Sequence, residues 1–86
     1  MKLEEEIIDA NKAGKIVLGY KESKKFLRVN DAKLVVIAKN APEKIRKEIE
    51  HNAKIAGVKI EVFNGSSKEL GVLCGKPYPV SVLVIK

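Results

Sequence analysis

The run Lys33-Leu-Val-Val-Ile-Ala38 decides how this chain folds. Its apolar residues follow one another without a polar face, and such runs are typical of strands inside a sheet that is covered on both sides. Asn30 and Asp31 before the run favour a turn. Pro42 after the run suits the first position of a helix, where its missing N–H costs nothing. The sequence therefore predicts a buried strand that leads into a helix beginning at Pro42.

Helices and strands alternate after this run. The elements expected there are a helix over 42–56 that Gly57 ends, a strand over 58–63, a short helix that opens with a capping box of Ser66 and Glu69, and a last strand over 80–85. Gly71 lies inside the short helix, where glycine costs about 1 kcal/mol relative to alanine. A glycine at such a position indicates close packing.

The same alternation precedes the run. The elements expected there are a helix from Leu3 that ends at Gly14, a strand over 16–18, and a helix over 23–29 that Ser23 caps. Gly19 stands between that strand and that helix, where it permits a turn or a close approach of the backbone to a ligand. The whole pattern predicts one domain over residues 1–86, an α/β fold built as a three-layer α/β/α sandwich around a mixed sheet of about four strands.

The charge of the chain narrows the choice of partners. The 17 Lys and Arg residues exceed the 11 Asp and Glu residues, which gives a formal net charge of +6 and a pI of about 9.5. Such an excess predicts a basic patch that binds nucleic acid. A lysine-rich surface that only keeps the protein soluble is the other interpretation of this composition.

The reactive side chains give no sign of catalysis. Cys74 is the only cysteine, which excludes an internal disulfide and a cysteine-based zinc site, and we expect it to be a small buried hydrophobic residue. His51 lies off the apolar stripe of its helix, and no nucleophile or acid stands at a spacing that would complete a catalytic set. We therefore expect no enzyme, no metal and no cofactor.

Nothing in this sequence resembles a signal peptide, and no apolar run approaches the ~20 residues that a membrane span needs. We accordingly expect a cytoplasmic protein that makes no use of a membrane and is a monomer when free.

Three motifs in register carry a family resemblance. They are Leu18-Gly-Tyr-Lys21, Lys33-Leu-Val-Val-Ile-Ala-Lys-Asn-Ala-Pro42, and Glu69-Leu-Gly71 with Cys74-Gly-Lys76. With their order and spacing they resemble the archaeal and eukaryotic large-subunit ribosomal proteins numbered thirty, within the kink-turn RNA-binding superfamily. The resemblance implies an α/β/α sandwich that binds a sharply bent RNA, in which tandem sheared G·A pairs adjoin an unpaired bulge. It also implies ribosomal RNA and the large ribosomal subunit as partners, and a place on the cytoplasmic ribosome.

The resemblance implies RNA-binding roles for eight residues, which are Gly19, Lys21, Lys25, Arg28, Asn40, Tyr78, Val80 and Ser81. The backbone of Gly19 would lie against the RNA, and Lys21 would contact the same region. Asn40 would approach the guanines of the G·A pairs. Tyr78 would stack on an unpaired base, and the two residues after Pro79 would belong to the loop that grips the bulge.

Physical chemistry supports these roles and leaves other roles open. Lysine and arginine side chains would supply a positive field toward phosphates, from Lys21, Lys24, Lys25, Arg28, Lys39 and Lys76. The amide of Asn40 can instead read a base edge, and a tyrosine ring can stack on a splayed base. Asn40 could equally be a helix cap before Pro42, Tyr78 a half-buried core aromatic residue, and Gly19 a simple turn.

The predicted function is that of a non-catalytic component of the large ribosomal subunit that binds a kink-turn in ribosomal RNA. One alternative is a sibling in the superfamily that serves guide RNAs for RNA modification. Those siblings usually carry Asn-Glu after the glycine and a small residue, whereas this chain has Tyr20-Lys21-Glu22. The other alternative is a regulatory module that binds an acidic protein or a small anion at helix N-termini.

Overall fold

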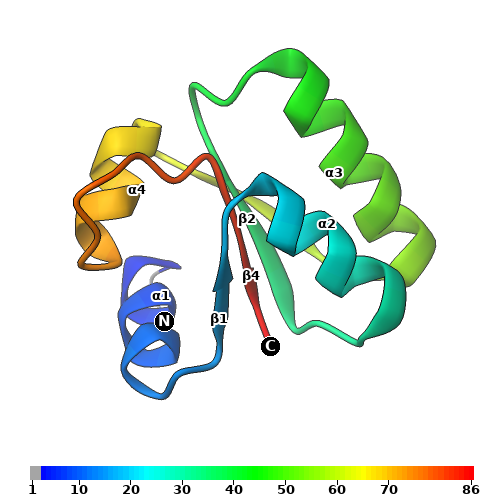
Figure 1. Cartoon of the computed structure of the whole chain (residues 1–86), viewed down its shortest axis with the longest axis horizontal. Coiled ribbons are helices and arrows are strands. Elements are labelled where there is room, and N and C mark those ends of the chain that lie inside the picture. Colours follow the sequence, from blue (N-terminus) through cyan, green and yellow to red (C-terminus); the bar gives the residue numbers. More distant parts are fainter. Residues whose placement is uncertain (1–2) are drawn as a thin grey trace.

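A computed structural model describes residues 3–86 of the chain. The elements follow one another as α1 (Leu3–Lys12), β1 (Ile16–Leu18), α2 (Tyr20–Val29), β2 (Leu34–Ala38), α3 (Glu43–Ala56), β3 (Ile60–Phe63), α4 (Ser67–Leu73) and β4 (Val82–Ile85). The strands form one sheet in the order β1-β4-β2-β3. Figure 1 shows helices on both sides of this sheet, which confirms the predicted α/β/α sandwich.

Each face of the sheet is covered by its own pair of helices. Leu34, Val36 and Ala38 of β2 pack in one core cluster with residues of α1 and α4. Val35 and Ile37 point the other way, into a second cluster with residues of α2 and α3. All the side chains of β2 are therefore buried, as predicted for the run that decides the fold.

The direction of the strands brings several loops to one end of the sheet. β4 lies between β1 and β2 and is antiparallel to both, while β3 is parallel to β2. β1, β2 and β3 therefore run in the same direction, and their carboxyl ends lie beside the start of β4. Loops held on a rigid frame of this kind are common places for binding sites.

The start of α2 differs from the prediction. Ser23 was expected to cap this helix, but α2 begins at Tyr20 and Gly19 is its N-cap. The cause is the backbone of Gly19, whose φ of 94° turns the chain from β1 directly into the helix. Ser23 N–H already donates to the carbonyl of Gly19 over 3.0 Å, so Ser23 lies within the helix. Its side chain is fully buried.

Smaller differences concern where other elements begin. β3 starts at Ile60 rather than at Val58, and β4 starts at Val82 rather than at Val80. Pro42 is the N-cap of α3 and not its first helical residue, so that helix begins one position later than predicted. These shifts leave Val80 and the residue after it in the loop before β4.

Two local predictions are confirmed. Cys74 is buried in the core cluster beneath α1 and α4, with 2% of its surface exposed. Gly71 packs so closely that a Cβ atom there would collide with the backbone carbonyl oxygen of Tyr78. Glycine at this position therefore lets the loop before β4 lie directly on α4.

Candidate nucleic-acid interface

The junction after β1, the junction after β2 and the loop before β4 meet at one end of the sheet (Figure 1). Gly19 N–H donates to the carbonyl of Val82 over 3.0 Å, and Ala38 N–H donates to the carbonyl of Ser81 over 2.8 Å. The junction after β1 and the junction after β2 are thus both tied to the chain at the start of β4. We call the surface formed by residues 19–21, 39–42, 65–67 and 75–81 the loop edge.

Gly19 has a backbone conformation that belongs almost only to glycine. Its φ of 94° and ψ of 156° lie in a region that other residues enter at a cost of about 1–3 kcal/mol. A Cβ atom built there would meet no atom within 4 Å, so the space beside it is open. Gly19 makes the turn, its N–H and its carbonyl are both hydrogen-bonded within the protein, and the space where a Cβ atom would stand stays open. The interpretation as a turn and the interpretation as a contact are therefore compatible.

Asn40 caps a helix other than the expected one. Its Oδ1 accepts a hydrogen bond from the N–H of Ser67 over 2.8 Å, at the start of α4. The suggestion that it caps the helix after Pro42 is therefore wrong, because tertiary folding brings the start of α4 beside the end of β2. The side chain remains exposed. Its Nδ2 makes no hydrogen bond with any of residues 3–86.

Ser67 is a part of the site that the sequence did not reveal. It contributes through its backbone, since its N–H donates to Asn40 and its carbonyl accepts from the N–H of Val80 over 2.9 Å. No pattern of side chains signals such a role. The only sequence signal was indirect, because the Ser66 capping box placed the start of a helix here.

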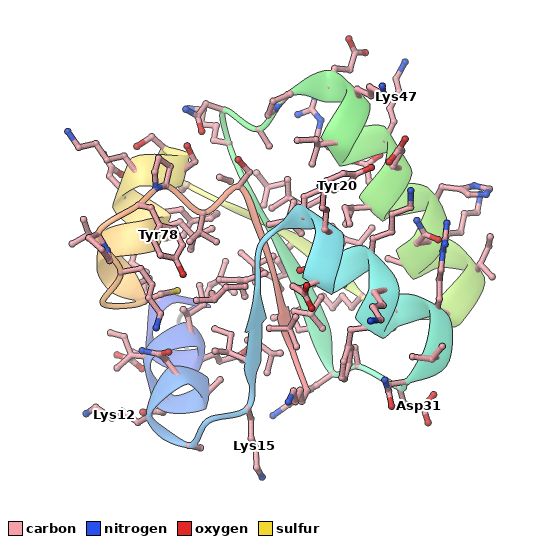
Figure 2. All side chains as sticks on the ribbon, viewed as in Figure 1. Lys12, Lys15, Tyr20, Asp31, Lys47 and Tyr78 are labelled. Carbon is pink, nitrogen blue, oxygen red and sulfur yellow. The ribbon has the colours of Figure 1, made fainter. Side chains whose placement is uncertain are left out.

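Tyr78 lies on the loop edge and outside both core clusters. The residue is 52% exposed and so is half-buried, but it belongs to neither cluster, and the suggestion that it is a core aromatic residue is therefore wrong. The ring lines a shallow groove of about 190 Å³ between α4 and the loop, together with Lys68, Val72, Lys76, Pro77 and Pro79. Figure 2 shows Tyr78 beside α4 and Tyr20 beside α2 and α3, on opposite sides of the loop edge.

Val80 and Ser81 hold the loop in place. The side chain of Val80 is 1% exposed and belongs to the core, so it is not available at the surface. Ser81 is partly buried, and its carbonyl pairs with the N–H of Ala38. Both residues therefore shape the loop edge from beneath.

The basic residues of α2 extend away from the loop edge. Lys21, Lys25 and Arg28 are exposed, and their spacing places them along one face of the helix. Lys21 is in the first turn, whereas Arg28 is in the last turn, about 10 Å further along the axis. The structure thus brings Lys21 close to Gly19 and leaves Arg28 apart from the loop edge.

Lys24 contributes less charge than the sequence suggested. Its Nζ lies 3.4 Å from a carboxylate oxygen of Glu48 and 5.7 Å from the centre of the Tyr20 ring. The ion pair joins α2 to α3 and partly neutralises the lysine. Lys39 and Lys76 remain exposed at the loop edge, where they add to its positive field.

A metal cluster, a reactive thiol and a membrane span are the other features to compare with the sequence predictions. No group of three or more His, Cys, Asp or Glu side chains within residues 3–86 could hold a metal ion. Burial raises the pKa of the Cys74 thiol, and the charge of Lys76 offsets only part of this effect. A thiol of this kind is a weak nucleophile. Across the same residues, no helix has both the length and the apolar character of a membrane span.

Known proteins resemble this chain over almost all of its length. The model of the Ribosomal protein L7Ae/L30e/S12e/Gadd45 family matches residues 1–86. A protein of Aeropyrum pernix named large ribosomal subunit protein eL30 is 36% identical over 85 residues, which cover 99% of this chain and 85% of that protein. The protein of the same name in Spodoptera frugiperda is 49% identical over 74 residues, covering 86% of this chain and 66% of that protein.

The fold has matches among solved structures. A structure described as the Giardia lamblia 15.5kD RNA binding protein superposes with a TM-score of 0.87 at 27% sequence identity, covering 96% of this chain and 69% of the other. A Bacillus halodurans protein described as having unknown function superposes with a TM-score of 0.84 at 19% identity, over 93% of this chain and 79% of that one. The second likeness concerns the fold alone.

Proposed function

Because this chain belongs to the Ribosomal protein L7Ae/L30e/S12e/Gadd45 family, we propose that it is a non-catalytic component of the large ribosomal subunit that binds a kink-turn in ribosomal RNA. Relatives named large ribosomal subunit protein eL30 support this proposal, since they match 84–100% of the chain at 36–49% identity. The proposed place of action is the cytoplasmic ribosome, and the free protein is proposed to be a monomer.

The observation that carries the proposal is the convergence of Gly19, Asn40 and Tyr78 on the loop edge. Gly19 leaves open space where a Cβ atom would stand, which lets another backbone approach closely, Asn40 offers amide donors, and Tyr78 offers an exposed aromatic ring. These three kinds of group suit a phosphate backbone, a base edge and an unpaired base respectively. A surface that bound only charge would need neither the amide nor the ring.

The proposed mechanism is selection of a bent RNA by a rigid surface. Side chains cannot enter the narrow major groove of A-form RNA, so proteins read bends and splayed bases instead. Lysines around the loop edge attract the backbone without regard to sequence. Asn40 and Tyr78 then add contacts that only the kinked conformer satisfies. The binding free energy of those contacts shifts the RNA population from extended to kinked.

A second candidate function is that of a sibling that serves guide RNAs. The likeness to the Giardia lamblia 15.5kD RNA binding protein keeps this candidate in view. Tyr20-Lys21-Glu22 at the start of α2 departs from the Asn-Glu pattern that those siblings usually carry. A regulatory module that binds an acidic protein is the remaining alternative. Co-sedimentation before and after nuclease treatment separates these functions, because a large-subunit component leaves the subunit peak when its RNA is degraded.

The direct experiment compares two RNAs at two salt concentrations. One RNA carries the kink-turn, and in the other the sheared G·A pairs are replaced by Watson–Crick pairs. We expect tight binding to the kink-turn alone, with a preference that persists at the higher salt concentration. Equal binding to both RNAs that collapses with salt would show that the loop edge is only an electrostatic surface, and the proposal would fall.

A further inference from the structure

Ser67 hydrogen-bonds to two segments of the loop edge that lie far apart in the sequence. Its N–H donates to Oδ1 of Asn40 over 2.8 Å, and its carbonyl accepts from the N–H of Val80 over 2.9 Å. Val80 directly follows the loop that carries Tyr78. A single residue of α4 therefore joins Asn40 on one side to the Tyr78 loop on the other.

The bond from Ser67 determines which way the amide of Asn40 faces. Only the oxygen of a side-chain amide accepts a hydrogen bond, so Oδ1 must be the atom beside α4. Nδ2 keeps both of its N–H donors, and neither is used by residues 3–86. Asn40 is therefore presented in the free protein mainly as a hydrogen-bond donor.

From this geometry we propose that Ser67 is a positioning residue for RNA recognition, an inference that rests on the proposed function. Its backbone N–H holds the Asn40 amide so that Nδ2 faces an acceptor edge of a purine, where guanine offers N7 and O6. The orientation is set before RNA arrives, so binding does not have to order this side chain.

The Ser67 N–H is free for this task because of its place in the helix. Ser67 is the first residue of α4, and the first N–H groups of a helix have no partner within it. The hydroxyl of Ser66 accepts instead from the N–H of Glu69 over 3.2 Å. Asn40 thus takes a donor that the helix leaves unpaired, and the hydroxyl of Ser67 plays no part in the contact.

α4 also fixes the second proposed contact. The backbone of Tyr78 lies directly on Gly71, one turn along the same helix, where there is no space for a Cβ atom. The first turn of α4 orients Asn40, and the next turn seats the Tyr78 loop. The two proposed contacts are therefore held by one short rigid element.

Ser67→Pro removes the N–H while leaving the helix able to form. Proline is favoured at the first position of a helix, and Ser66 already has φ −77° and ψ 166°, which suit a residue before proline. Ser67→Ala is the matched control, because it removes the hydroxyl and keeps the N–H. We expect Ser67→Pro to lower affinity for the kink-turn RNA about fivefold to tenfold, and Ser67→Ala to change it less than about twofold.

Asn40→Asp separates the capping role from the donor role. An aspartate oxygen still accepts from Ser67, but the side chain has no N–H to offer to RNA. We expect this variant to fold as well as the wild type and to lose at least about tenfold in affinity. In the Asn40→Ala background, which lacks both roles, Ser67→Pro should have no further effect on RNA affinity.

A modified RNA tests the donor role directly. Replacing a guanine of the G·A pairs by 7-deazaguanine should weaken binding by the wild type and leave binding by Asn40→Asp unchanged.

The possible outcomes separate this inference from the proposed function. If the wild type does not prefer the kink-turn RNA, both fall. If the wild type shows the preference and Ser67→Pro binds equally well, or lowers affinity by the same factor with and without Asn40, only the positioning role of Ser67 falls.

Amide hydrogen exchange tests the same contact in the free protein, without RNA and without the proline substitution. The Ser67 N–H should be protected in the wild type and in Asn40→Asp, and should exchange faster in Asn40→Ala; equal exchange in all three would overturn the inference.

Discussion

Replacing Gly71 by alanine should destabilise the protein and displace the loop that carries Tyr78. A Cβ atom on Gly71 would collide with the carbonyl oxygen of Tyr78, and it would lie 3.1 Å from the carbonyl carbon of Tyr78 and 3.4 Å from Cα of Pro79. These atoms all belong to the backbone. No side-chain rotation can relieve the collision, so the loop itself has to move.

Two opposing terms set the size of the effect. Forcing an extra methyl group into a packed site costs about 1–3 kcal/mol. Alanine is favoured over glycine inside a helix by about 1 kcal/mol, which offsets part of that cost. A collision with backbone atoms belongs at the upper end of that range, about 2–3 kcal/mol, so we expect the free energy of unfolding to fall by about 1–2 kcal/mol. In a domain of this size such a loss lowers the Tm by about 5–15 °C.

Urea denaturation of the wild type, Gly71→Ala and Val72→Ala measures this effect. Val72 lies in the same helix but is 68% exposed, so its truncation should change stability by less than about 0.5 kcal/mol. We also expect Gly71→Ala to weaken binding to a kink-turn RNA, because the Tyr78 loop is displaced. An alanine variant as stable as the wild type, or more stable, would refute the argument that this contact is tight.

Four further predictions follow from individual residues. Gly19→Ala should cost about 1–3 kcal/mol of stability through backbone strain alone, measured by the same denaturation, since no atom lies within 4 Å of the added Cβ. Ser23→Ala should leave stability unchanged or raise it by about 1 kcal/mol, because Ser23 Oγ is buried without a hydrogen-bond partner among residues 3–86; a clear loss of stability would contradict this. Lys25→Ala should weaken binding to kinked and unkinked RNA alike and reduce the slope of log K against log salt by about one unit in a salt titration. Burial raises the pKa of Cys74 above its ordinary value of 9.0, so the unfolded thiol ionises first and stability should fall as the pH rises above 9.0; Cys74→Ala should show a smaller fall over the same pH range.

Much of the fold was determined by local patterns in the sequence. The apolar run of β2 predicts a strand with both faces covered, because it is short, rich in β-branched residues and without a polar face. The alternation of helices and strands then predicts helices on the two faces of one sheet. Gly71 and Cys74 were also understood correctly, since a glycine inside a helix and a lone cysteine in an apolar stretch indicate packing wherever they occur.

The candidate site was only partly determined in this way. The types of residue that suit RNA, such as Asn40 and Tyr78, can be chosen from their chemistry and from the family resemblance. The groups that hold these residues in place cannot be predicted in the same way. The Ser67 N–H that bonds to Asn40 is a backbone group 27 residues away, and no side-chain pattern in the sequence indicates it. The two roles expected of Val80, in the last strand and in the loop that grips RNA, were not resolved either, since an apolar residue at the end of a loop can face the core or the solvent; the structure buries it.

Sequence alone determined which segments are helices and strands, which faces are apolar and which residues have the chemistry to meet RNA. These properties depend on neighbours along the chain. Tertiary structure alone decided that β4 inserts between β1 and β2 and that α4 lies beside the end of β2. Each of these depends on contacts between distant segments, whose free energy is set by how the whole core packs and not by any local pattern.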